Sequence, residues 1–406
     1  MRYTIGQLAE IIDGDRGKNY PKQDEFYPQG YCLFLNTGNV TKEGLIFEEN
    51  QFITKEKDEA LRKGKLKRGD IVYTTRGTVG NAGYYNSNVP YENVRINSGM
   101  VILRANGEIV DARFLYQILK SEYYRPYFKQ YCTGSAQPQL PIKNFSQIYL
   151  NVPDIKTQHR IADILSAYDD LIENNQKQIK LLEEAAQRLY KEWFVDLRFP
   201  GHENTKIVDG VPEGWQYEKL GDLVKTTSGG TPSRRKSEYY VNGNIRWIKT
   251  KELNDRFIFE TEEHITEDAV KNSSAKVLPE GALIVAMYGA TIGKIGITAA
   301  EMACNQACCA FISFDDMISK EYLYCWLMDN RENLVSQGKG AAQSNLSQEM
   351  IRNFSLLCPD KKVIKNFTEI VTTMLENKRV LENKILMLTK ARDDLLPKLM
   401  SGEVEV

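Results

Sequence analysis

Basic, polar and aromatic side chains that can bind nucleic acid are concentrated in one segment of this chain, residues 225–251. The segment reads KTTSGGTPSRRKSEYYVNGNIRWIKTK and contains a single acidic residue, Glu238. Lysine and arginine can neutralise DNA phosphates, and arginine, asparagine and glutamine can form hydrogen bonds with base edges in the major groove. The composition of this segment therefore favours a nucleic-acid-binding surface.

Two segments in the first half of the chain have a similar but looser composition. They contain Arg16, Lys18, Asn19, Tyr20 and Lys22, and then Arg62, Lys63, Lys65, Lys67, Arg68 and Arg76. The net charge of the whole chain is only −1, and a run of basic residues is also typical of an ordinary solvated surface. We expect the acidic residues to lie away from the basic loops, for instance at Asp169 and Asp170, Glu183 and Glu184, and Glu260 to Glu263. Taken alone, the loops leave both interpretations open.

Patterns that would support catalysis are weak. Histidine occurs only at His159, His202 and His264, in three separate contexts, so neither a histidine metal site nor a catalytic triad is indicated. The run GATIGKI at 289–295 is one residue short of a phosphate-binding loop and lacks the Ser or Thr that would bind magnesium. The sequence also lacks an Asn-Pro-Pro-aromatic tetrapeptide of amino-methyltransferases and a glycine fingerprint for a nucleoside cofactor. We therefore expect no catalytic residues, bound metal or cofactor in this chain.

Two other clusters have simpler interpretations. Asp360, Glu376 and Lys378 resemble the residues of a metal-dependent nuclease, but Glu376 and Lys378 are two positions apart on an expected helix and do not share a face. We expect an ordinary solvated helix face there. Cys304, Cys308 and Cys309 lie in an apolar, strand-like segment without a nearby histidine, and we expect buried, reduced thiols.

The elements that must position the basic loops occur twice in the chain. Gly134 to Leu140 and Gly340 to Leu346 have a matching pattern of small residues around a central glutamine, at a constant offset (340 − 134 = 346 − 140 = 206). Upstream, Gly77 and Gly80 correspond to Gly289 and Gly293, and we expect these glycines to shape tight turns. The repeat predicts two globular domains of about 150 residues each.

A long helical segment follows each domain. Apolar residues recur at steps of three and four in both segments: Ile161, Ile164, Tyr168, Leu171, Asn175, Ile179, Leu182 and Leu189, and Phe367, Ile370, Met374, Leu381, Ile385, Leu388 and Leu395. This spacing favours an antiparallel coiled coil, with two amphipathic core helices as the alternative. The expected helix ends are Phe199-Pro200-Gly201 for the first and Pro397 followed by Gly402 for the second. Asn175 is expected to help fix the register.

These patterns predict an α+β fold of two tandem domains separated by two long antiparallel helices, with pseudo-two-fold symmetry. Expected strands include Asp70 to Thr74 and Ala282 to Ala286, and expected helices include Ala112 to Tyr124 and Lys320 to Asp329. The predicted division is 1–155 for the first domain, 156–199 for the first spacer helix, 200–212 for a linker, 213–360 for the second domain, 361–400 for the second spacer helix and 401–406 for a tail.

Composition places the chain among globular proteins. Hydrophobic residues make up 42% and charged residues 26% of the sequence, without an apolar run near 18 residues. The first residues, Met1 to Gln7, contain no apolar signal region, so we expect a cytoplasmic protein without a membrane span.

The sequence resembles the specificity subunits of type I restriction-modification systems. The resemblance covers nearly the whole chain and rests on the duplicated plan of domain and helix, the paired turns at 136–140 and 342–346, the linker WFVDLRFPG at 193–201, and the opening VPEGW at 211–215. The first domain departs from this pattern because it begins directly at Arg2 without the Pro-Glu-Gly-Trp opening.

This resemblance implies that each globular unit is a target recognition domain that reads one half of a bipartite, asymmetric site in double-stranded DNA. The long helices would separate the domains and hold two copies of an adenine-N6 DNA methyltransferase subunit, joined by a restriction and translocase subunit. S-adenosylmethionine, ATP and magnesium would then belong to the partner subunits. Two readers of this kind would meet one face of B-DNA at half-sites about 34 to 36 Å apart.

The resemblance also suggests candidate site residues, because family recognition domains present polar loops to the major groove. The candidates for DNA binding are Arg16, Lys18, Asn19, Thr75, Arg76, Asn81 and Gln137 in the first domain, and Thr227, Arg234, Arg235, Lys236, Tyr239, Lys249, Tyr288, Lys294 and Gln343 in the second. Gln137 and Gln343 have an alternative role in holding a turn. The candidates for a surface that binds a partner subunit are Leu181, Leu182, Tyr190, Trp193 and Phe194, for which packing against the other helix is the alternative.

Two other functions remain as alternatives. A pseudo-symmetric scaffold for protein partners would leave DNA methylation unchanged. A fused restriction enzyme is disfavoured, because the two repeats already occupy the chain and no catalytic motif fits within them.

Overall fold

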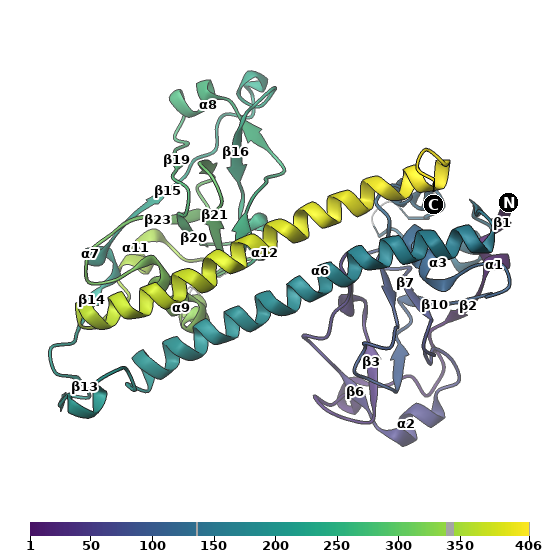
Figure 1. Cartoon of the computed structure of the whole chain (residues 1–406), viewed down its shortest axis with the longest axis horizontal. Coiled ribbons are helices and arrows are strands. Elements are labelled where there is room, and N and C mark those ends of the chain that lie inside the picture. The colour runs from purple at the N-terminus through teal and green to yellow at the C-terminus, as the bar shows by residue number, and fades with distance from the viewer. Residues whose placement is uncertain (135–136, 338–344, 406) are drawn as a thin grey trace. The chain divides into compact units, whose positions relative to one another are not determined.

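A computed structural model describes residues 1–134, 137–337 and 345–405 of the chain. The chain forms two compact units: the first contains Met1–Ile172 and Met387–Val406, and the second contains Glu173–Leu386 (Figure 1). Each unit thus consists of one globular domain and parts of both long helices. Gln343 lies outside the described residues, and its predicted role stays a prediction.

The first unit has a four-stranded antiparallel sheet at its centre, in the order β2-β10-β7-β8. A second sheet has the order β6-β3-β9, in which β3 and β9 are parallel. The strands are β1 (Arg2–Thr4), β2 (Ala9–Asp13), β3 (Cys32–Leu35), β4 (Val40–Thr41), β5 (Gly44–Leu45), β6 (Phe52–Ile53), β7 (Ile71–Thr74), β8 (Ala82–Tyr84), β9 (Val94–Ile96), β10 (Met100–Ala105) and β11 (Tyr149–Asn151). The helices of the domain are α1 (Ile5–Leu8), α2 (Lys55–Ala60), α3 (Ala112–Lys120), α4 (Arg125–Lys129) and α5 (Ile142–Ser146).

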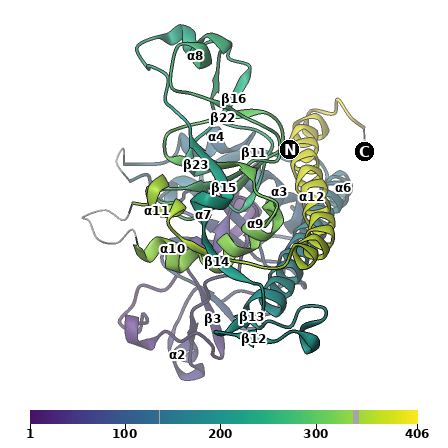
Figure 2. The ribbon, with the colours of Figure 1, turned by 90° about the vertical axis from the view of Figure 1, so that its left-hand side faces the viewer.

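The second unit repeats this topology. Its main sheet has the order β15-β23-β20-β21-β17. In a second sheet, β18-β16-β22-β19, the neighbouring strands β16 and β22 are parallel, as β3 and β9 are in the first unit. The strands are β12 (Ile207–Val208), β13 (Val211–Pro212), β14 (Gln216–Lys219), β15 (Val224–Ser228), β16 (Ile245–Ile248), β17 (Arg256–Ile258), β18 (His264–Ile265), β19 (Val277–Leu278), β20 (Leu283–Ala286), β21 (Ile295–Thr298), β22 (Met302–Cys304), β23 (Cys308–Phe314) and β24 (Ser355–Cys358). The helices are α7 (Leu220–Leu223), α8 (Glu267–Lys271), α9 (Lys320–Asp329), α10 (Arg331–Gln337) and α11 (Gln348–Arg352), with α7 and α11 beside β15 (Figure 2).

The repeat predicted from the sequence is therefore confirmed at the level of strand order. In both units the strand that precedes the long helix pairs with a strand near the start of the domain, β11 with β1 and β24 with β14. The expected turn glycines also adopt left-handed backbone conformations in both copies, with φ of 70° at Gly77, 101° at Gly80, 90° at Gly289 and 77° at Gly293. A side chain at these positions would be strained.

Alternating side chains explain why the central strands form. In β7, Ile71 and Tyr73 pack into one apolar cluster while Val72 faces another, and β20 divides Leu283 and Val285 from Ile284 in the same way. Successive side chains of a strand point to opposite faces, so both faces of each central sheet are buried. This double burial accounts for the nearly continuous apolar runs in the sequence.

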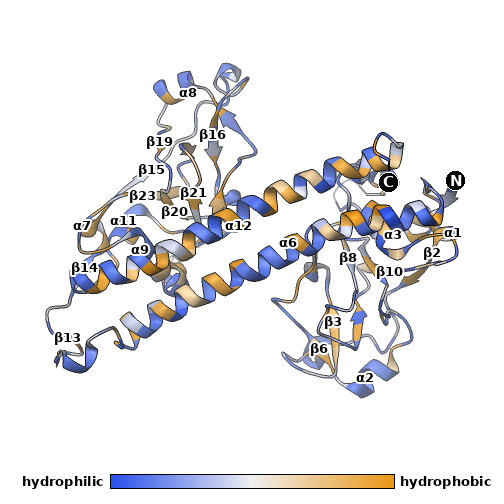
Figure 3. Cartoon of the chain, viewed as in Figure 1, coloured by the Kyte–Doolittle hydropathy of each residue, from blue (hydrophilic) through white to orange (hydrophobic). Residues whose placement is uncertain are grey.

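The long helices are α6 (Ile155–Tyr190), which ends in the π-helical turn η3 (Lys191–Val195), and α12 (Lys361–Ser401). They run antiparallel where they meet within each unit. In the second unit Tyr190 packs on Phe367, and in the first unit Asp169 of α6 pairs with Arg392 of α12. Polar and apolar residues are interspersed along both helices (Figure 3). Within the described residues, neither helix nor any other is long and apolar enough to cross a membrane.

The predicted apolar stripe of these helices was wrong in detail. Ile164, Leu171 and Ile370 are exposed, and the buried positions are one residue later, at Leu165, Ile172 and Val371. The apolar stripe was thus assigned to the neighbouring position where adjacent residues were both apolar. Asn175 is buried, as its predicted place in the helix seam requires.

Pro397 does not end the second helix. The helix continues to Ser401, and Gly402, with φ of 77°, follows it as a left-handed cap. Proline removes one backbone donor and bends a helix, but a last turn can continue beyond it.

The predicted end of another helix was also wrong: α3 ends at Lys120 rather than at Tyr124, because Ser121 adopts an extended conformation before α4 begins.

Candidate DNA interface

The candidate loops of the first unit meet at one end of its central sheet. β2 ends opposite the start of β10, which in turn starts opposite the end of β7. The backbone amides of Thr75 and Arg76 donate to the carbonyl of Gly99 at 2.9 and 3.1 Å, and Leu140 donates to the carbonyl of Thr75 at 2.9 Å. Gly14 lies so close to the Asn97 carbonyl that no side chain would fit there. The loops that follow β2, β7 and β9 therefore form one continuous surface with the segment around Gln139.

Basic side chains of the first unit are accessible on this surface. Lys18 and Arg76 are exposed, whereas Arg16 pairs with Asp13 at 3.2 Å and donates to the Ser98 carbonyl at 3.1 Å. A small cavity of about 190 Å³ is lined by Asp15, Gly17, Lys18, Asn19 and Arg62. The Arg62 side chain is 78% exposed. Arg62 belongs with the candidate residues, although in the sequence it was only one of several basic residues in a loosely basic segment.

Two candidates of the first unit are buried and support the loops from within. Thr75 donates through Oγ1 to the Gly99 carbonyl at 3.1 Å, and Asn81 donates through Nδ2 to the Val40 carbonyl at 2.9 Å. Their polar groups are used inside the protein, so they are placed to shape the surface rather than to contact a ligand. Asn19 donates to the Ala60 carbonyl at 3.0 Å, and Gln137 is exposed in the segment that Gln139 holds against Arg76.

The second unit builds the same junction from different residues. The amide of Gly230 donates to the Cys304 carbonyl at 3.0 Å, and Leu346 donates to the Met287 carbonyl at 2.7 Å. The loop after β15 is thereby held against the end of β22, and the segment at Leu346 is held against the turn after β20, as Leu140 is held against Thr75 in the first unit. Of the candidates, Thr227 lies near the end of β15, and the others lie on the loop after β15 or on the turn after β20: Arg234, Arg235, Lys236, Tyr288 and Lys294.

Most cations of the second unit are paired with carboxylates, which overturns one expectation. The acidic run at Glu260 to Glu263 was expected to lie away from the basic loops. Instead Arg246 pairs with Glu260 at 2.9 Å, Arg234 pairs with Glu263 at 2.6 Å, and Lys249 contacts both Glu262 and Glu263. The reason is that this acidic run leads directly into β18, which pairs with β16, the strand that carries Arg246 and precedes Lys249.

Other candidates of the second unit differ in accessibility. Lys294 pairs with Asp255 at 2.8 Å, and Thr227 accepts a hydrogen bond from Lys276 at 3.1 Å. Tyr239 is buried, and its hydroxyl lies 2.8 Å from Nζ of Lys236, which raises the pKa of that lysine. Tyr288 is half-buried and Arg235 is exposed. The accessible basic positions at this loop are therefore Arg234, Arg235 and Lys236.

Three of the five residues expected to face a partner subunit are buried in their own unit. Tyr190, Trp193 and Phe194 pack around Phe367, with ring centroids 4.9 Å apart for Phe194 and Phe367. The expectation of an open apolar surface is corrected for these three, since α12 covers them. The alternative of packing against the other helix is the correct one here.

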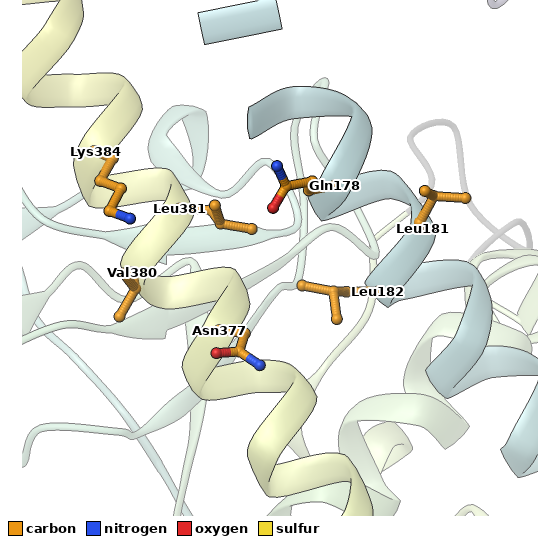
Figure 4. Close-up of a pocket in the computed structure, with 7 residues that line it drawn as sticks. All are labelled: Gln178, Leu181, Leu182, Asn377, Val380, Leu381 and Lys384. Atoms are coloured by element: carbon orange, nitrogen blue, oxygen red, sulfur yellow. The ribbon is translucent and has the colours of Figure 1, made fainter. Parts of the chain in front are cut away.

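Leu181 and Leu182 lie on an open groove between α6 and α12. Leu181 is 64% exposed. The groove has a volume of about 510 Å³, and Leu182 and Leu381 point toward one another across it (Figure 4). Its lining residues are Gln178, Leu181, Leu182, Asn377, Val380, Leu381 and Lys384.

The nuclease-like residues of α12 do not form a site. Glu376 and Lys378 lie on different faces, as expected, with side-chain exposures of 58% and 1%. The expected solvated face was wrong for Lys378, because its side chain is buried against α6 and α9. The cysteines 304, 308 and 309 are buried as predicted. Within the described residues, no group of three or more His, Cys, Asp or Glu side chains is placed to hold a metal ion.

Comparisons with known proteins agree with this architecture. A family model described as the type I restriction modification DNA specificity domain matches residues 1–184 and again residues 212–387. The specificity subunit of the type I restriction enzyme HindI from Haemophilus influenzae is 28% identical, over 98% of this chain and 100% of that protein. The MjaIX specificity subunit from Methanocaldococcus jannaschii is 27% identical, over 86% of this chain and 81% of that protein.

A solved structure shows the same fold. The S subunit of a type I restriction-modification system from M. genitalium aligns with a TM-score of 0.58 and 16% sequence identity. The alignment covers 98% of this chain and 95% of that one.

Proposed function

This chain belongs to the type I restriction-modification DNA specificity family, whose model matches both of its repeated parts, and we propose that each of its two domains reads one half of a bipartite DNA target. Its relatives are specificity subunits, and catalysis in these systems lies in other subunits. The chain is accordingly a specificity subunit and not itself an enzyme.

One observation carries the proposal: both domains gather their loops at the same end of the central sheet. The Thr75–Leu140 and Met287–Leu346 backbone hydrogen bonds are equivalent contacts in the two copies. The shared framework supports a common role, while the side chains displayed on it differ, with Lys18 and Arg76 in the first and Arg234 and Arg235 in the second. Two unlike reading surfaces favour an asymmetric target with two different half-sites.

Accessible cations account for attraction to the DNA backbone. Lys18, Arg62 and Arg76 in the first domain, with Arg235 and Lys236 in the second, are placed to neutralise phosphates, and such contacts position a protein without specifying sequence. Base readout then falls to the polar residues around them, including Arg16, Asn19 and Gln137. Salt dependence distinguishes a DNA-binding surface from an ordinary solvated surface, because only a DNA-binding surface requires binding to DNA that weakens with salt.

The long helices are proposed to hold the partner subunits. The groove lined by Leu181, Leu182 and Leu381 is an apolar surface that one methyltransferase subunit would cover. By the family relationship, two such subunits that methylate adenine at N6 and a restriction and translocase subunit complete the assembly. S-adenosylmethionine, ATP and magnesium would bind to those subunits, in the cytoplasm. The boundaries proposed for the recognition domains are 1–155 and 213–360, with spacer helices at 156–199 and 361–400, a linker at 200–212 and a tail at 401–406.

Long-read sequencing of adenine methylation tests this function directly. Genomes of the host with and without the gene are compared, with expression of the companion methyltransferase verified in both. The proposal expects deletion to remove methylation at one motif that consists of two short, unlike half-sites around an unread spacer. An unchanged methylation pattern would instead favour a scaffold that binds only protein partners.

A further inference from the structure

Arg234 is held in one orientation by three side chains of the second unit. Its guanidinium lies over the rings of Tyr240 and Trp247, at 4.4 and 5.2 Å from their centroids. On another side, Nη1 lies 2.6 Å from Oε2 of Glu263. Arginine combines with aromatic faces and carboxylates in this way because its group is planar and carries its donors in a fixed fork.

The residues around Arg234 are themselves fixed. Trp247 donates through Nε1 to the Gly230 carbonyl at 3.1 Å, and Tyr240 donates to the Pro232 carbonyl at 2.6 Å. Both rings are thus tied to the loop that carries Arg234. Glu263 is fixed as well, since Lys249 contacts its other carboxylate oxygen. Burial tends to raise the pKa of Glu263, but its pairing with Lys249 and Arg234 outweighs this and lowers the pKa, so the carboxylate stays charged at neutral pH.

The clamped guanidinium is still available to a ligand. The Arg234 side chain is 54% exposed. The contact with Glu263 is made through Nη1. The edge on which arginine can present two donors to a planar pair of acceptors is the one formed by Nε and Nη2. The negative charge of Glu263 also offsets the charge of Arg234. The attraction of Arg234 to a phosphate is therefore reduced, while its hydrogen-bond donors remain. A group of this kind contributes more to the choice of base than to general DNA affinity.

Arg235, the next residue, has the opposite properties. It is exposed, and no carboxylate is paired with it in the described part of the chain. An unpaired and exposed arginine keeps its full attraction to the DNA backbone, and a phosphate contact does not require a fixed orientation. Two adjacent arginines of one loop are therefore suited to two different tasks.

We propose that Arg234 is a base-reading residue of the second domain and that it selects guanine, whereas Arg235 contacts phosphate. Guanine presents O6 and N7 together in the major groove, and arginine donates to both in the commonest specific contact between protein and DNA. Glu263 is a positioning residue that holds Arg234 for this contact. The inference rests on the proposed function, because it assumes that the second domain reads DNA.

Selection of a randomised duplex library by the full-length chain tests the inference. Wild type, Arg234→Lys, Glu263→Gln and Arg235→Ala are compared after circular dichroism has shown equal folding. We expect wild type to select a motif that contains a guanine. In Arg234→Lys the preference for that guanine should fall by about 10-fold or more, because lysine keeps the charge of arginine but not its planar pair of donors. Arg235→Ala is the matched control: its motif should be unchanged, and the slope of log affinity against log salt should fall by about 1.

Glu263→Gln gives a second measurement that does not change Arg234 itself. Removing the carboxylate charge should weaken the guanine preference and at the same time raise non-specific DNA affinity at low salt, because the charge of Arg234 is then free to attract phosphates. An unchanged motif in both Arg234→Lys and Glu263→Gln would overturn the inference while the selected motif still supports the proposed function. If wild type selects no motif at all, the proposed function itself fails.

Discussion

The ammonium group of Lys378 lies 2.7 Å from a carboxylate oxygen of Glu183, which joins α12 to α6 through an ion pair whose lysine is buried and whose glutamate is half-buried. The same ammonium group donates to the Asp255 carbonyl at 2.5 Å and to the Tyr324 hydroxyl at 3.3 Å. A second carboxylate, Glu382, lies 3.6 Å away. One lysine thus connects both long helices of the second unit with α9 and with the loop before β17.

Loss of the Lys378 ammonium group should destabilise the second unit. Breaking a buried pair leaves an uncompensated charge, so we expect Lys378→Met to lower the free energy of unfolding by about 3–5 kcal/mol. All four tryptophans, Trp193, Trp215, Trp247 and Trp326, belong to this unit, and their fluorescence in urea therefore reports its unfolding. Lys365→Met, at an exposed position of the same helix, is the control and should change the value by less than about 0.5 kcal/mol. Equal stability of the two variants would mean that the pair does not hold the helices.

Stability of the first unit should depend on pH through Asp169. This carboxylate lies 2.6 Å from Nζ of Lys120 and 2.7 Å from Nη1 of Arg392. Burial acts to raise its pKa, but these two cations and Gln117 lower it below the ordinary value of 3.8. Its stabilising contribution is therefore complete above about pH 4 and is lost as the pH falls through the lower pKa of the folded state.

Asp169→Asn should remove this contribution at neutral pH. We expect it to lower the free energy of unfolding by about 3–5 kcal/mol at pH 7, with the difference from wild type shrinking below pH 4. Hydrogen exchange measured by mass spectrometry on peptides of α3 reports this unit. Asp170→Asn, at the exposed neighbouring position, is the control. A difference between Asp169→Asn and wild type that stays constant down to pH 2.5 would show that the charge of Asp169 is not responsible.

A substitution in the groove between the helices should weaken partner binding without affecting folding. Leu181→Glu places a charge on an exposed residue, so we expect unchanged thermal stability but at least about 10-fold weaker co-purification of the methyltransferase subunit. Val241→Glu, a similarly exposed apolar position in a recognition loop, should leave co-purification unchanged. Retention of the partner by Leu181→Glu would place its binding site elsewhere.

Trp193→Ala, in the π-helical turn at the end of α6, should reduce stability without directly removing a partner contact. Trp193 is buried against Phe367, and removal of a buried tryptophan costs about 3–5 kcal/mol of stability. Urea unfolding followed by the three remaining tryptophans measures this loss. A fully stable variant that nevertheless lost its partner would restore Trp193 to the partner surface.

In the first domain, Arg76→Ala should weaken DNA binding without changing the motif. Its side chain is exposed at the junction of the loops, and loss of one phosphate contact should lower the salt slope by about 1. Fluorescence anisotropy with a duplex at several salt concentrations measures the slope. Asn81→Ala, at a buried and hydrogen-bonded position, should instead reduce the melting temperature. The assignment would fail if Arg76→Ala altered the selected bases and left the slope unchanged.

Features that depend on neighbouring residues could be read from the sequence. The turn glycines Gly77 and Gly289, the bounds of α9 and the duplicated order of the elements follow from local backbone preferences and from apolar periodicity. The family resemblance rested on the same kind of signal, since it came from the order and spacing of short motifs. Even here, adjacent apolar residues such as Ile164 and Leu165 were interchangeable, because a pattern of steps of three and four does not say which of two neighbours faces inward.

Contacts between distant segments were decided only by the tertiary structure. The sequence placed Arg234 and Lys249 in a basic loop, but the pairing of β16 with β18 brings Glu262 and Glu263 against them. In the same way Lys378 looks like any helix lysine until α6 supplies Glu183 and α9 supplies Tyr324. A side chain's type states what it can bind, whereas its burial and its partners depend on which other elements fold against it. For this protein, the sequence by itself determined the repeated scaffold and its family, and the packing of that scaffold decided which charges are neutralised and which remain free.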